Sequence, residues 1–348
     1  MGRPAPTDPR LNRAAAMEAF RMAAMAFGNV VAQAVYVAAK LGLADLLESG
    51  PKSVEELARA SGAHAPSLAR LLRALTSFDV FVEEETTGRY ALNPLGATLL
   101  SGKPGSVRDA VLMAGDPIFN RPCGEMTHAV VSGQPAFEHM FGARFFDYLA
   151  RHPESAAVFD TGMAMFSEME NGPIAAAYDF SAFARVIDVG GGRGGFLAAI
   201  LRAHPDVRGA LYDLPRVVKE ATLLDAPDLQ ARTSRLGGDF LQSVPALFDA
   251  YVLKRVLHDW DDDTCIAILR RCREGLPASG RVVAIDAVLR PANEPDPSKV
   301  SDLLMMILCP GRERTEPEFA AIFNAAGLRL TRVIPTPTPL SIVEGAPA

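Results

Sequence analysis

The chain has 348 residues, of which 49% are hydrophobic and 22% are charged, and its formal net charge is −6. These values are typical of a folded globular protein of about two domains, and they exclude a disordered or fibrous chain. Lysine and arginine are scattered singly along the sequence, without the dense positive charge that drives binding to nucleic acid. We therefore expect no nucleic-acid partner.

The cysteines and the N-terminal segment bear on the compartment. The four cysteines lie far apart and form none of the close pairs that are typical of zinc sites or secreted disulfide frameworks. Residues 1–20 lack the continuous apolar stretch of a signal peptide. The apolar run from Met22 to Leu43 is interrupted by polar residues at 29, 33 and 40, which suits a buried or interface helix better than a membrane span. We expect reduced thiols, no membrane partner and a cytoplasmic location.

Residues 1–110 have the pattern of a small, mostly helical domain. Ser53 and Glu56 form a capping box at a helix start, and Pro66 suits the first turn of a second helix. Residues 78–82 and 89–92 then have the pattern of two strands joined by a polar turn. Two helices followed by a hairpin predict a winged-helix-like domain.

Winged helices often bind DNA, so a ligand-sensing DNA-binding regulator is an alternative function. The helix that would enter the groove, residues 67–77, carries only Arg70 and Arg73 as cations, and the tip of the hairpin reads Glu83-Glu84-Glu85. Duplex DNA would require positive charge at both places. The charge pattern argues against this alternative, which we keep as the second class of function.

Residues 111–180 are predicted to be helical and are rich in Phe, Met and Ala. An aromatic and methionine stripe is often ordinary core, but a position between two domains also favours a small-molecule pocket. We treat this region as a helical linker that contributes to the substrate pocket. Its candidate substrate contacts are Phe159, Met163 and Phe166.

Residues 181–348 alternate between strand and helix patterns. Strands are predicted at 186–189, 210–212, 250–253 and 281–285, a further strand ends before Gly238, and helices are predicted at 196–203 and 262–276. A helix at 316–326 and strands at 328–334 and 340–343 complete the region. This order predicts an α/β domain with a Rossmann-like doubly wound sheet that binds its ligand at the carboxyl ends of the strands.

The strongest local signal is the glycine-rich turn that follows the first of these strands. Gly190, Gly192 and Gly195 fit the dinucleotide pattern GxGxxG, whereas Asp188, Gly190, Gly192 and Gly194 fit the methyltransferase pattern of an acidic residue followed by GxGxG. Glycine at these positions allows the backbone to approach a ligand closely. The turn alone does not distinguish the two cofactors.

Two carboxylates at later strand ends favour an adenosine ligand. Asp213 ends the second strand, where an acidic side chain accepts hydrogen bonds from ribose hydroxyls. Asp239 and Phe240 follow the third strand and offer a carboxylate and an aromatic face to an adenine ring. Each aspartate alone could instead cap a helix or face water. Both in register point to an adenosine site.

From about residue 20 to its end the chain resembles the plant-caffeate-type family of small-molecule O-methyltransferases and its bacterial natural-product relatives. The resemblance rests on five motifs in this order: DVGGGRGG (188–195), YDLPRVV (212–218), GDF (238–240), LKRVLHDWDDD (253–263) and GRERTEPEF (311–319). It implies a winged-helix dimerisation domain, a seven-stranded methyltransferase sheet and S-adenosyl-L-methionine as cofactor. It also implies a homodimer in which one protomer helps to cover its partner's active site.

The resemblance also implies roles for individual residues. His258 matches the general base, and Glu313 and Asp286 match the two acidic residues that flank it. Plant members carry Glu where this chain has Asp286, and commonly an aromatic residue where it has Arg255, so the reach of the acid and the pocket wall differ here. Asp259, beside the base, joins the candidate substrate contacts. The implied cofactor contacts are Asp188, Gly190, Gly192, Asp213, Leu214, Asp239, Phe240 and Lys254.

A histidine base suits methylation of a phenolic hydroxyl of a small secondary metabolite. A phenol has a pKa near ~10, and a histidine near ~6.5 can accept its proton during transfer. By position alone His258 could equally be a histidine at a helix start. Methylation of carbon or nitrogen, or a non-methylating reaction on the same fold, is the alternative within the enzyme class. The run Asp261-Asp262-Asp263 begins a helix and is predicted to cap it, so we expect no metal.

Overall fold

The computed structural model describes residues 9–348, and the chain divides into two compact units, Met1–Pro117 and Ile118–Ala348. The first unit is mostly helical, as predicted. Its core is formed by apolar side chains of the helices between residues 34 and 112 together with Val80, Phe81 and Tyr90. Its helices are α1 (Pro9–Ala26), α2 (Gly28–Lys40), α3 (Leu43–Leu47), α4 (Val54–Ser61), α5 (Ala65–Thr76), α6 (Pro94–Ala97) and α7 (Arg108–Gly115).

Local signals in the first unit act as the sequence predicts at the helix starts. Ser53 caps α4 through the predicted box, since its hydroxyl accepts from the Glu56 amide and the Glu56 carboxylate accepts from the Ser53 amide. Pro66 lies in the first turn of α5. The capping residues therefore fix where both helices begin.

The hairpin is much shorter than predicted. Its strands β1 (Val82–Glu83) and β2 (Tyr90–Ala91) have two residues each. The prediction that residues 78–81 are extended is wrong, because the amide of Val80 bonds back to the carbonyl of Leu75 and Asp79 takes a left-handed conformation at φ 56°. The end of α5 thus continues as a tight turn, and the strand starts late.

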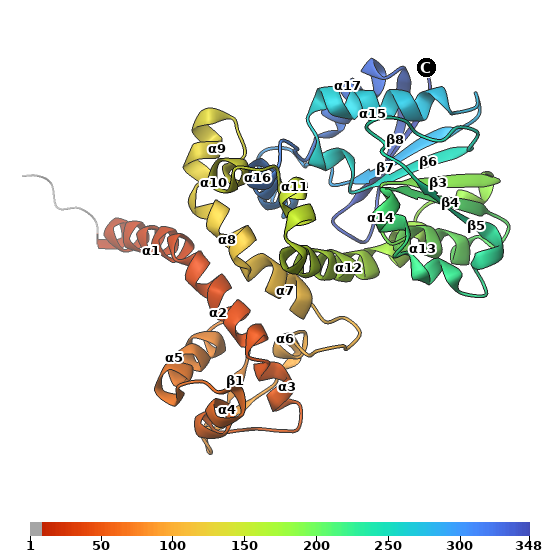
Figure 1. Cartoon of the computed structure of the whole chain (residues 1–348). Coiled ribbons are helices and arrows are strands. Elements are labelled where there is room, and N and C mark those ends of the chain that lie inside the picture. The colour runs from red at the N-terminus through yellow and green to blue at the C-terminus, as the bar shows by residue number, and fades with distance from the viewer. Residues whose placement is uncertain (1–8) are drawn as a thin grey trace, which may run out of the picture. The chain divides into compact units, whose positions relative to one another are not determined.

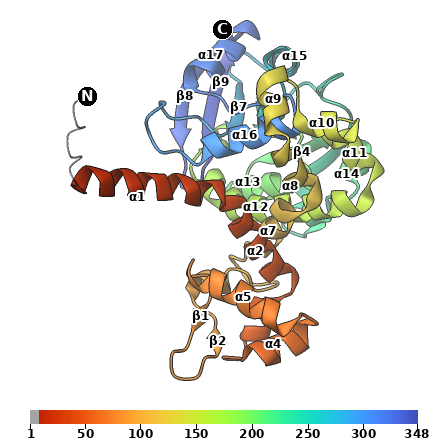
Figure 2. The same cartoon turned by 90° about the vertical axis from the view of Figure 1, so that its left-hand side faces the viewer.

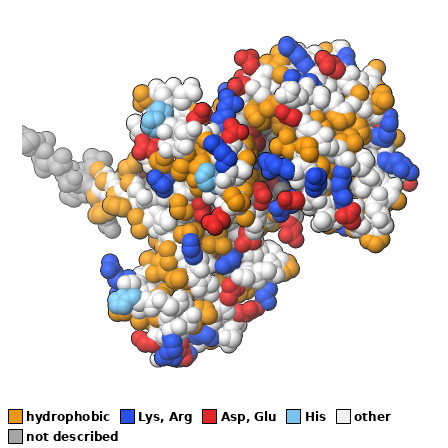
Figure 3. Space-filling model, viewed as in Figure 1, with side chains coloured by type: hydrophobic (Ala, Val, Ile, Leu, Met, Phe, Trp, Pro, Cys, Tyr) orange, Lys and Arg blue, Asp and Glu red, His pale blue; other side chains and the backbone are white. Residues whose placement is uncertain are grey.

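The long apolar N-terminal run forms α1 and α2. Within the described residues, no single helix is long and apolar enough to cross a membrane, although Ala15–Ala26 and Gly28–Lys40, bent by 45° at their junction, pass the length and composition test as a pair. Hydrophobic side chains gather along these helices (Figure 3). The exposed ones are Met17, Phe20, Met22, Met25, Phe27 and Val30.

The second unit begins with helices that carry an aromatic cluster. Phe119, Phe137, Phe145 and Phe159 pack mainly edge to face within it. These helices are α8 (Pro117–Gly124), α9 (Met126–Ser132), α10 (Ala136–Phe141), α11 (Phe145–Arg151) and α12 (Pro153–Ala176). The 24-residue α12 is the longest, and it packs against α13 (Gly195–Ala203).

A seven-stranded sheet in the order β5-β4-β3-β6-β7-β9-β8 forms the centre of the second unit (Figure 1). The first five strands in this order are parallel and only β9 and its neighbours pair antiparallel, which confirms the predicted Rossmann-like fold. The strands are β3 (Arg185–Val189), β4 (Arg208–Asp213), β5 (Thr233–Gly237), β6 (Ala250–Lys254), β7 (Arg281–Asp286), β8 (Leu328–Pro335) and β9 (Ser341–Pro347).

Each face of the sheet is covered by its own hydrophobic core. One core joins alternate strand residues to α13 and the end of α12, and the other joins the opposite strand residues to α15 (Asp262–Glu274) and α17 (Glu316–Ala325). Because β3, β4, β5, β6 and β7 are parallel, their carboxyl ends share one edge. The turns that follow those ends therefore hold the candidate site.

Two helices of the second unit were not predicted from the sequence, and the shorter of them is α14 (Pro215–Val218). Helix α16 (Ser298–Leu308) follows a proline-containing loop and lies beside α9 and α10 (Figure 2). Its apolar run, Leu303 to Leu308, is too short to show helical periodicity clearly. Its packing against helices far away in the sequence defines it instead.

Candidate functional site

The glycine turn joins β3 to α13 with a backbone that side chains would not permit. Gly190, Gly192 and Gly194 have φ values of 70°, 59° and 78°, in the region that glycine alone adopts at little cost. A Cβ at Gly190 would also stand 2.9 Å from Val256 and 3.3 Å from the Phe240 ring. The backbone of this turn can therefore be approached closely, and the Phe240 ring lies beside it.

Asp188 lies beneath this turn and is fully buried, and neither of its carboxylate oxygens has a hydrogen-bond partner. Burial raises its pKa to about 7, against the pull of the nearby Lys254 cation. A buried acceptor without a donor is costly. It marks a place where a ligand that carries a donor or a positive charge would be stabilised.

Asp213 ends β4 beside the turn. One carboxylate oxygen accepts from the Gly192 amide at 2.9 Å and the other from the Leu214 amide at 2.7 Å. Burial raises its pKa, although these amide bonds oppose the shift. Leu214 itself is 38% exposed, so its side chain stands at the rim of the site.

Asp239 and Phe240 follow β5 on the same edge of the sheet. The Asp239 carboxylate accepts from the amide of Leu241 at 2.9 Å, and the Phe240 ring meets the Trp260 ring edge to face at 6.1 Å. Phe240 also neighbours Gly190. The structure thus brings together the aromatic ring, the glycine turn and the strand-end carboxylates predicted from sequence.

Lys254, at the end of β6, and Arg255 share one buried carboxylate that the sequence analysis missed. Glu170 of α12 is 4% exposed, and it pairs with Lys254 Nζ at 3.1 Å and accepts from Nε of Arg255, also at 3.1 Å. Arg255 has φ 54°, a left-handed conformation that costs a non-glycine residue roughly 1–3 kcal/mol. No sequence pattern links residue 170 to residues 254 and 255.

His258 lies in the short helix η4 (Leu257–Asp259) just beyond Lys254 and Arg255. Its Nδ1 is 3.1 Å from Oε1 of Glu313, which also accepts from the Ser301 hydroxyl. A carboxylate only accepts, so Nδ1 carries a hydrogen and Nε2 is left for proton exchange. Nε2 lies 3.6 Å from Asp259.

Three carboxylates set the protonation of His258. Burial by itself would lower the pKa of the imidazole, but Asp259, the Glu313 hydrogen bond and Asp286 outweigh burial and raise this pKa to about 9. Burial has the opposite effect on the Asp259 carboxyl, whose pKa it raises, because burial disfavours the charged form of either group. His258 thus lies in a negatively charged pocket that strongly stabilises its protonated form.

Asp286, at the end of β7, is close enough to influence His258 but does not touch it by a hydrogen bond. Both of its oxygens are buried without a partner, and burial raises its pKa to about 7. Its side chain is one methylene shorter than that of Glu. It therefore acts on His258 through charge, whereas Glu313 makes the direct bond.

The backbone around His258 is held by a second residue that the sequence analysis missed. Arg314 is completely buried and donates to the carbonyls of Leu257 and Trp260 at 2.9 and 2.8 Å, and twice to the Asp262 carboxylate. It lies in the quoted motif at 311–319, directly after Glu313. Its position there was the only available signal.

Three of the four predicted substrate contacts lie on α12. Phe159 belongs to the aromatic cluster, 5.3 Å from Phe145 and stacked 6.2 Å from Phe119. Met163 is half-buried and Phe166 is 37% exposed on α12. The fourth, Asp259, lies beside the imidazole.

The aspartate run at 261–263 caps a helix. Asp261 is the N-cap of α15 and accepts from the Thr264 amide at 2.8 Å, while Asp262 pairs with Arg312 and Arg314. Across residues 9–348 no group of three or more His, Cys, Asp and Glu side chains has the arrangement of a metal site.

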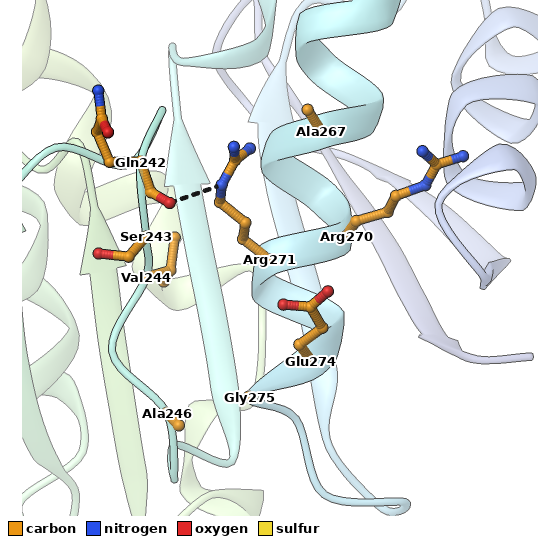
Figure 4. A pocket seen from close by; sticks show the side chains of 9 residues that line it. All are labelled: Gln242, Ser243, Val244, Ala246, Ala267, Arg270, Arg271, Glu274 and Gly275. Atoms are coloured by element: carbon orange, nitrogen blue, oxygen red, sulfur yellow. Dashed lines mark hydrogen bonds between the residues drawn. The ribbon is translucent and has the colours of Figure 1, made fainter.

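A surface pocket of about 450 Å³ lies elsewhere, between α15 and the loop that precedes β6 (Figure 4). Ala246 and Gly275 mark its far end, near the amino end of β6. It is lined by Gln242, Ser243, Val244, Ala246, Ala267, Arg270, Arg271, Glu274 and Gly275. The pocket is therefore separate from the candidate site, which lies beyond the carboxyl end of that strand.

The fold and these residues define an α/β enzyme with an adenosine-type cofactor site. Comparison with known proteins gives the family. Residues 124–329 match the O-methyltransferase domain, and residues 23–102 match the O-methyltransferase dimerisation domain. The chain belongs to this O-methyltransferase family and is an S-adenosylmethionine-dependent methyltransferase. This membership decides between the two classes of function in favour of the enzyme.

Three relatives illustrate the similarity. The chain is 44% identical over 324 residues to the phenazine O-methyltransferase PhzM of Lysobacter antibioticus, covering 93% of this chain and 94% of the relative. It is 36% identical over 328 residues to the phenazine-1-carboxylate N-methyltransferase of Pseudomonas aeruginosa, covering 92% and 95%. The S-adenosylhomocysteine-bound structure of CalO1, a methyltransferase of calicheamicin biosynthesis, matches with a TM-score of 0.86 and 42% identity, covering 95% and 98%.

Proposed function

We propose that this enzyme methylates a phenolic hydroxyl of a small aromatic secondary metabolite, with His258 as general base. The observation that carries the proposal is the bond between His258 Nδ1 and Glu313, which leaves Nε2, 3.6 Å from Asp259, as the nitrogen that can exchange a proton at the cofactor edge of the sheet. Relatives that act on phenazines support an aromatic acceptor. A phenolic oxygen becomes a strong nucleophile as its proton leaves.

The residues present fit the cofactor. Gly190 and Gly192 let the backbone approach it, and Asp213 would accept from its ribose hydroxyls. Asp239 and Phe240 would hold its adenine ring. The orphaned Asp188 carboxylate suits the positive charge of its methionine portion, with Lys254 and Leu214 completing the wall. The cofactor supplies an activated methyl group on a sulfonium.

His258 would take the acceptor's proton at Nε2, and Glu313 would hold the ring in one tautomer and stabilise the imidazolium that forms. Asp286 adds negative charge behind the ring. Asp259, Phe159, Met163 and Phe166 are our candidates for orienting the acceptor. Holding the oxygen, methyl and sulfur in line would account for much of the remaining acceleration.

Nitrogen methylation is the second candidate. The specific observation in its favour is the N-methyltransferase of Pseudomonas aeruginosa among the relatives. The site itself favours oxygen, because a buried base with an acidic partner is needed most where the acceptor atom must lose a proton before it attacks. Mass spectrometry and NMR of the product would show which atom carries the new methyl.

We also propose a homodimer in the cytoplasm. The match to a dimerisation domain and the exposed Met17, Phe20, Met22, Met25 and Phe27 on α1 and the α1–α2 junction support self-association, since a monomer rarely exposes so many large apolar side chains together. The spacing of the cysteines supports a reducing compartment. Light scattering would give the oligomeric state, and a monomer at micromolar concentration would contradict the first proposal.

The test of the cofactor site is calorimetric titration with S-adenosylhomocysteine. The wild type should bind, and Asp213→Ala should weaken binding about 10- to 100-fold, the effect of losing hydrogen bonds to a charged acceptor. Asp206→Ala, an exposed aspartate in the loop before β4, is the matched control. Equal affinity in all three proteins would overturn the assignment of Asp213.

A further inference from the structure

Glu170 of α12 is a buried carboxylate between two functional segments. Its two oxygens accept from Nε and Nη2 of Arg255 and pair with Nζ of Lys254, and the side chains of Glu170 and Lys254 are 5% and 6% exposed. A bidentate guanidinium pair fixes both partners in orientation as well as position. Glu170 therefore sets where the backbone emerging from β6 can go.

Two buried cations depend first on the carboxylate of Glu170. Burial opposes the charged form of Glu170, yet Arg255 and Lys254 outweigh it and lower the pKa of this carboxyl. Burial lowers the pKa of Lys254, and Glu170 opposes that change. Glu170 is thus the directly bonded counter-charge of both cations, and its removal would leave Lys254 with Asp188 and Arg255 with Asp286 and Glu313 as the remaining negative charges.

Arg255 carries this constraint toward His258. It is left-handed at φ 54°, its amide donates to the carbonyl of Ile285 at 2.9 Å, and it precedes the histidine by three residues. A strained backbone of this kind persists only where its surroundings hold it. The pair with Glu170 supplies that support through the side chain of Arg255.

We propose that Glu170 is a positioning residue for methyl transfer, which holds Arg255 in its left-handed turn and so presents His258 to the acceptor. The proposal deepens the function proposed above and rests on His258 being the base. Glu170 lies on the helix that carries Phe159 and Met163. It therefore also ties the candidate acceptor helix to the segment that carries the base.

The charges that face His258 define what loss of Glu170 would do. Asp259 on η4, Asp286 at the end of β7 and Glu313 before α17 act on His258 directly. Arg255 acts on these three carboxylates, and Arg314 lies behind the η4 carbonyls. Without Glu170 the guanidinium of Arg255 loses its main counter-charge. Its positive charge would then bear more strongly on the carboxylates that it shares with His258, and so would disfavour the imidazolium.

The experiment is an NMR titration of histidine-labelled protein saturated with S-adenosylhomocysteine, with the His258 signal assigned from His258→Gln. We expect Glu170→Gln to lower the pKa of His258 by roughly 0.5 to 1, to shift its signal, and to change S-adenosylhomocysteine affinity by several-fold. Glu168→Gln, an exposed residue on the same helix, should leave all three unchanged.

A folded Glu170→Gln protein whose His258 signal and pKa match the wild type would overturn the proposal. If Glu170→Gln does not fold, Arg255→Lys, which keeps the charge but loses the bidentate pair, gives the same readout: a shifted His258 signal supports the proposal and an unchanged one overturns it. Failure of the proposed function looks different, since His258→Gln would then methylate as fast as the wild type, or the new methyl group would lie on an atom other than oxygen.

Discussion

Gly311 lies directly against the backbone of His258. A Cβ at residue 311 would collide with the carbonyl oxygen of His258 and with backbone atoms of Asp259. Gly311 is buried and begins the segment that also supplies Glu313 and Arg314. The backbone of His258 therefore packs directly against the backbone of Gly311, and no flexible side chain lies between them that could move aside.

We predict that Gly311→Ala displaces η4 and lowers kcat at least about 10-fold, because small displacements of a catalytic group are costly. S-adenosylhomocysteine affinity should change less, since the glycine turn is elsewhere. Steady-state kinetics with any acceptor that the wild type methylates, together with calorimetry, would measure both. Gly172→Ala is the control, because Gly172 is an exposed helical glycine with no atom near its Cβ position.

Arg314→Lys should destabilise the protein by about 2–4 kcal/mol. Lysine cannot replace the planar fork that binds two carbonyls and Asp262 at once, and it would leave buried acceptors unpaired. Denaturant unfolding would measure the loss. Arg312→Lys provides the comparison, since Arg312 is 42% exposed in its pairs with Asp262 and Glu318 and should lose less than about 1 kcal/mol. Equal losses would contradict the special role of Arg314.

The dependence of kcat/KM on pH should report His258. The base must be neutral to accept a proton, and its pKa in the cofactor-free protein is raised to about 9. We therefore expect kcat/KM to rise with pH through the neutral and mildly alkaline range. Glu313→Gln removes a bond to the imidazolium, so the inflection should move to lower pH. His258→Gln should lower kcat about 10²- to 10⁴-fold.

Calorimetry distinguishes a catalytic role of His258 from a purely structural role. S-adenosylhomocysteine should still bind to His258→Gln with affinity close to the wild type. A profile whose inflection is the same in Glu313→Gln would show that another group titrates.

Asp188→Asn should raise the melting temperature at alkaline pH. The carboxyl pKa is raised from 3.8 to about 7 in the folded protein, so folding takes up a proton between those values and stability falls as the pH rises through them. Asparagine removes that dependence and gains about 1–2 kcal/mol at pH 8. The gain should be smaller at pH 5, and cofactor affinity should fall. Melting curves at both pH values, with the exposed Asp206→Asn as control, test the sign.

Sequence patterns predicted the elements of the second unit well because its signals are local. A buried strand, a glycine turn and an N-cap depend on neighbours a few residues away, and β3, β4, β6, β7, α13 and α15 fall within a few residues of their predicted bounds. The first strand of the hairpin was predicted too long because Asp79 adopts a turn that residue type alone does not dictate.

Sequence patterns predict the site only in part, because its residues come from elements that lie far apart in the sequence. His258 and Glu313 were paired through the resemblance, not through any local rule. Glu170 lies 84 residues before Lys254 and meets it only because α12 packs on α13 and the sheet. Arg314 likewise lies in a polar stretch of the sequence, and only the structure shows that it is buried behind η4. Contacts between distant elements depend on tertiary register, which periodicity does not encode.

The cysteines offer a built-in reporter of local opening. Cys265 is buried and its thiol lies 3.1 Å from the carbonyl of Leu257, in the same short helix as His258, and burial raises its pKa to about 12. Cys272 and Cys309 are also buried, and Cys123 alone is exposed. A Cys123→Ser protein would therefore react with alkylating reagents only when its structure opens. The rate at which Cys265 is modified would then measure how often the segment that carries His258 opens locally.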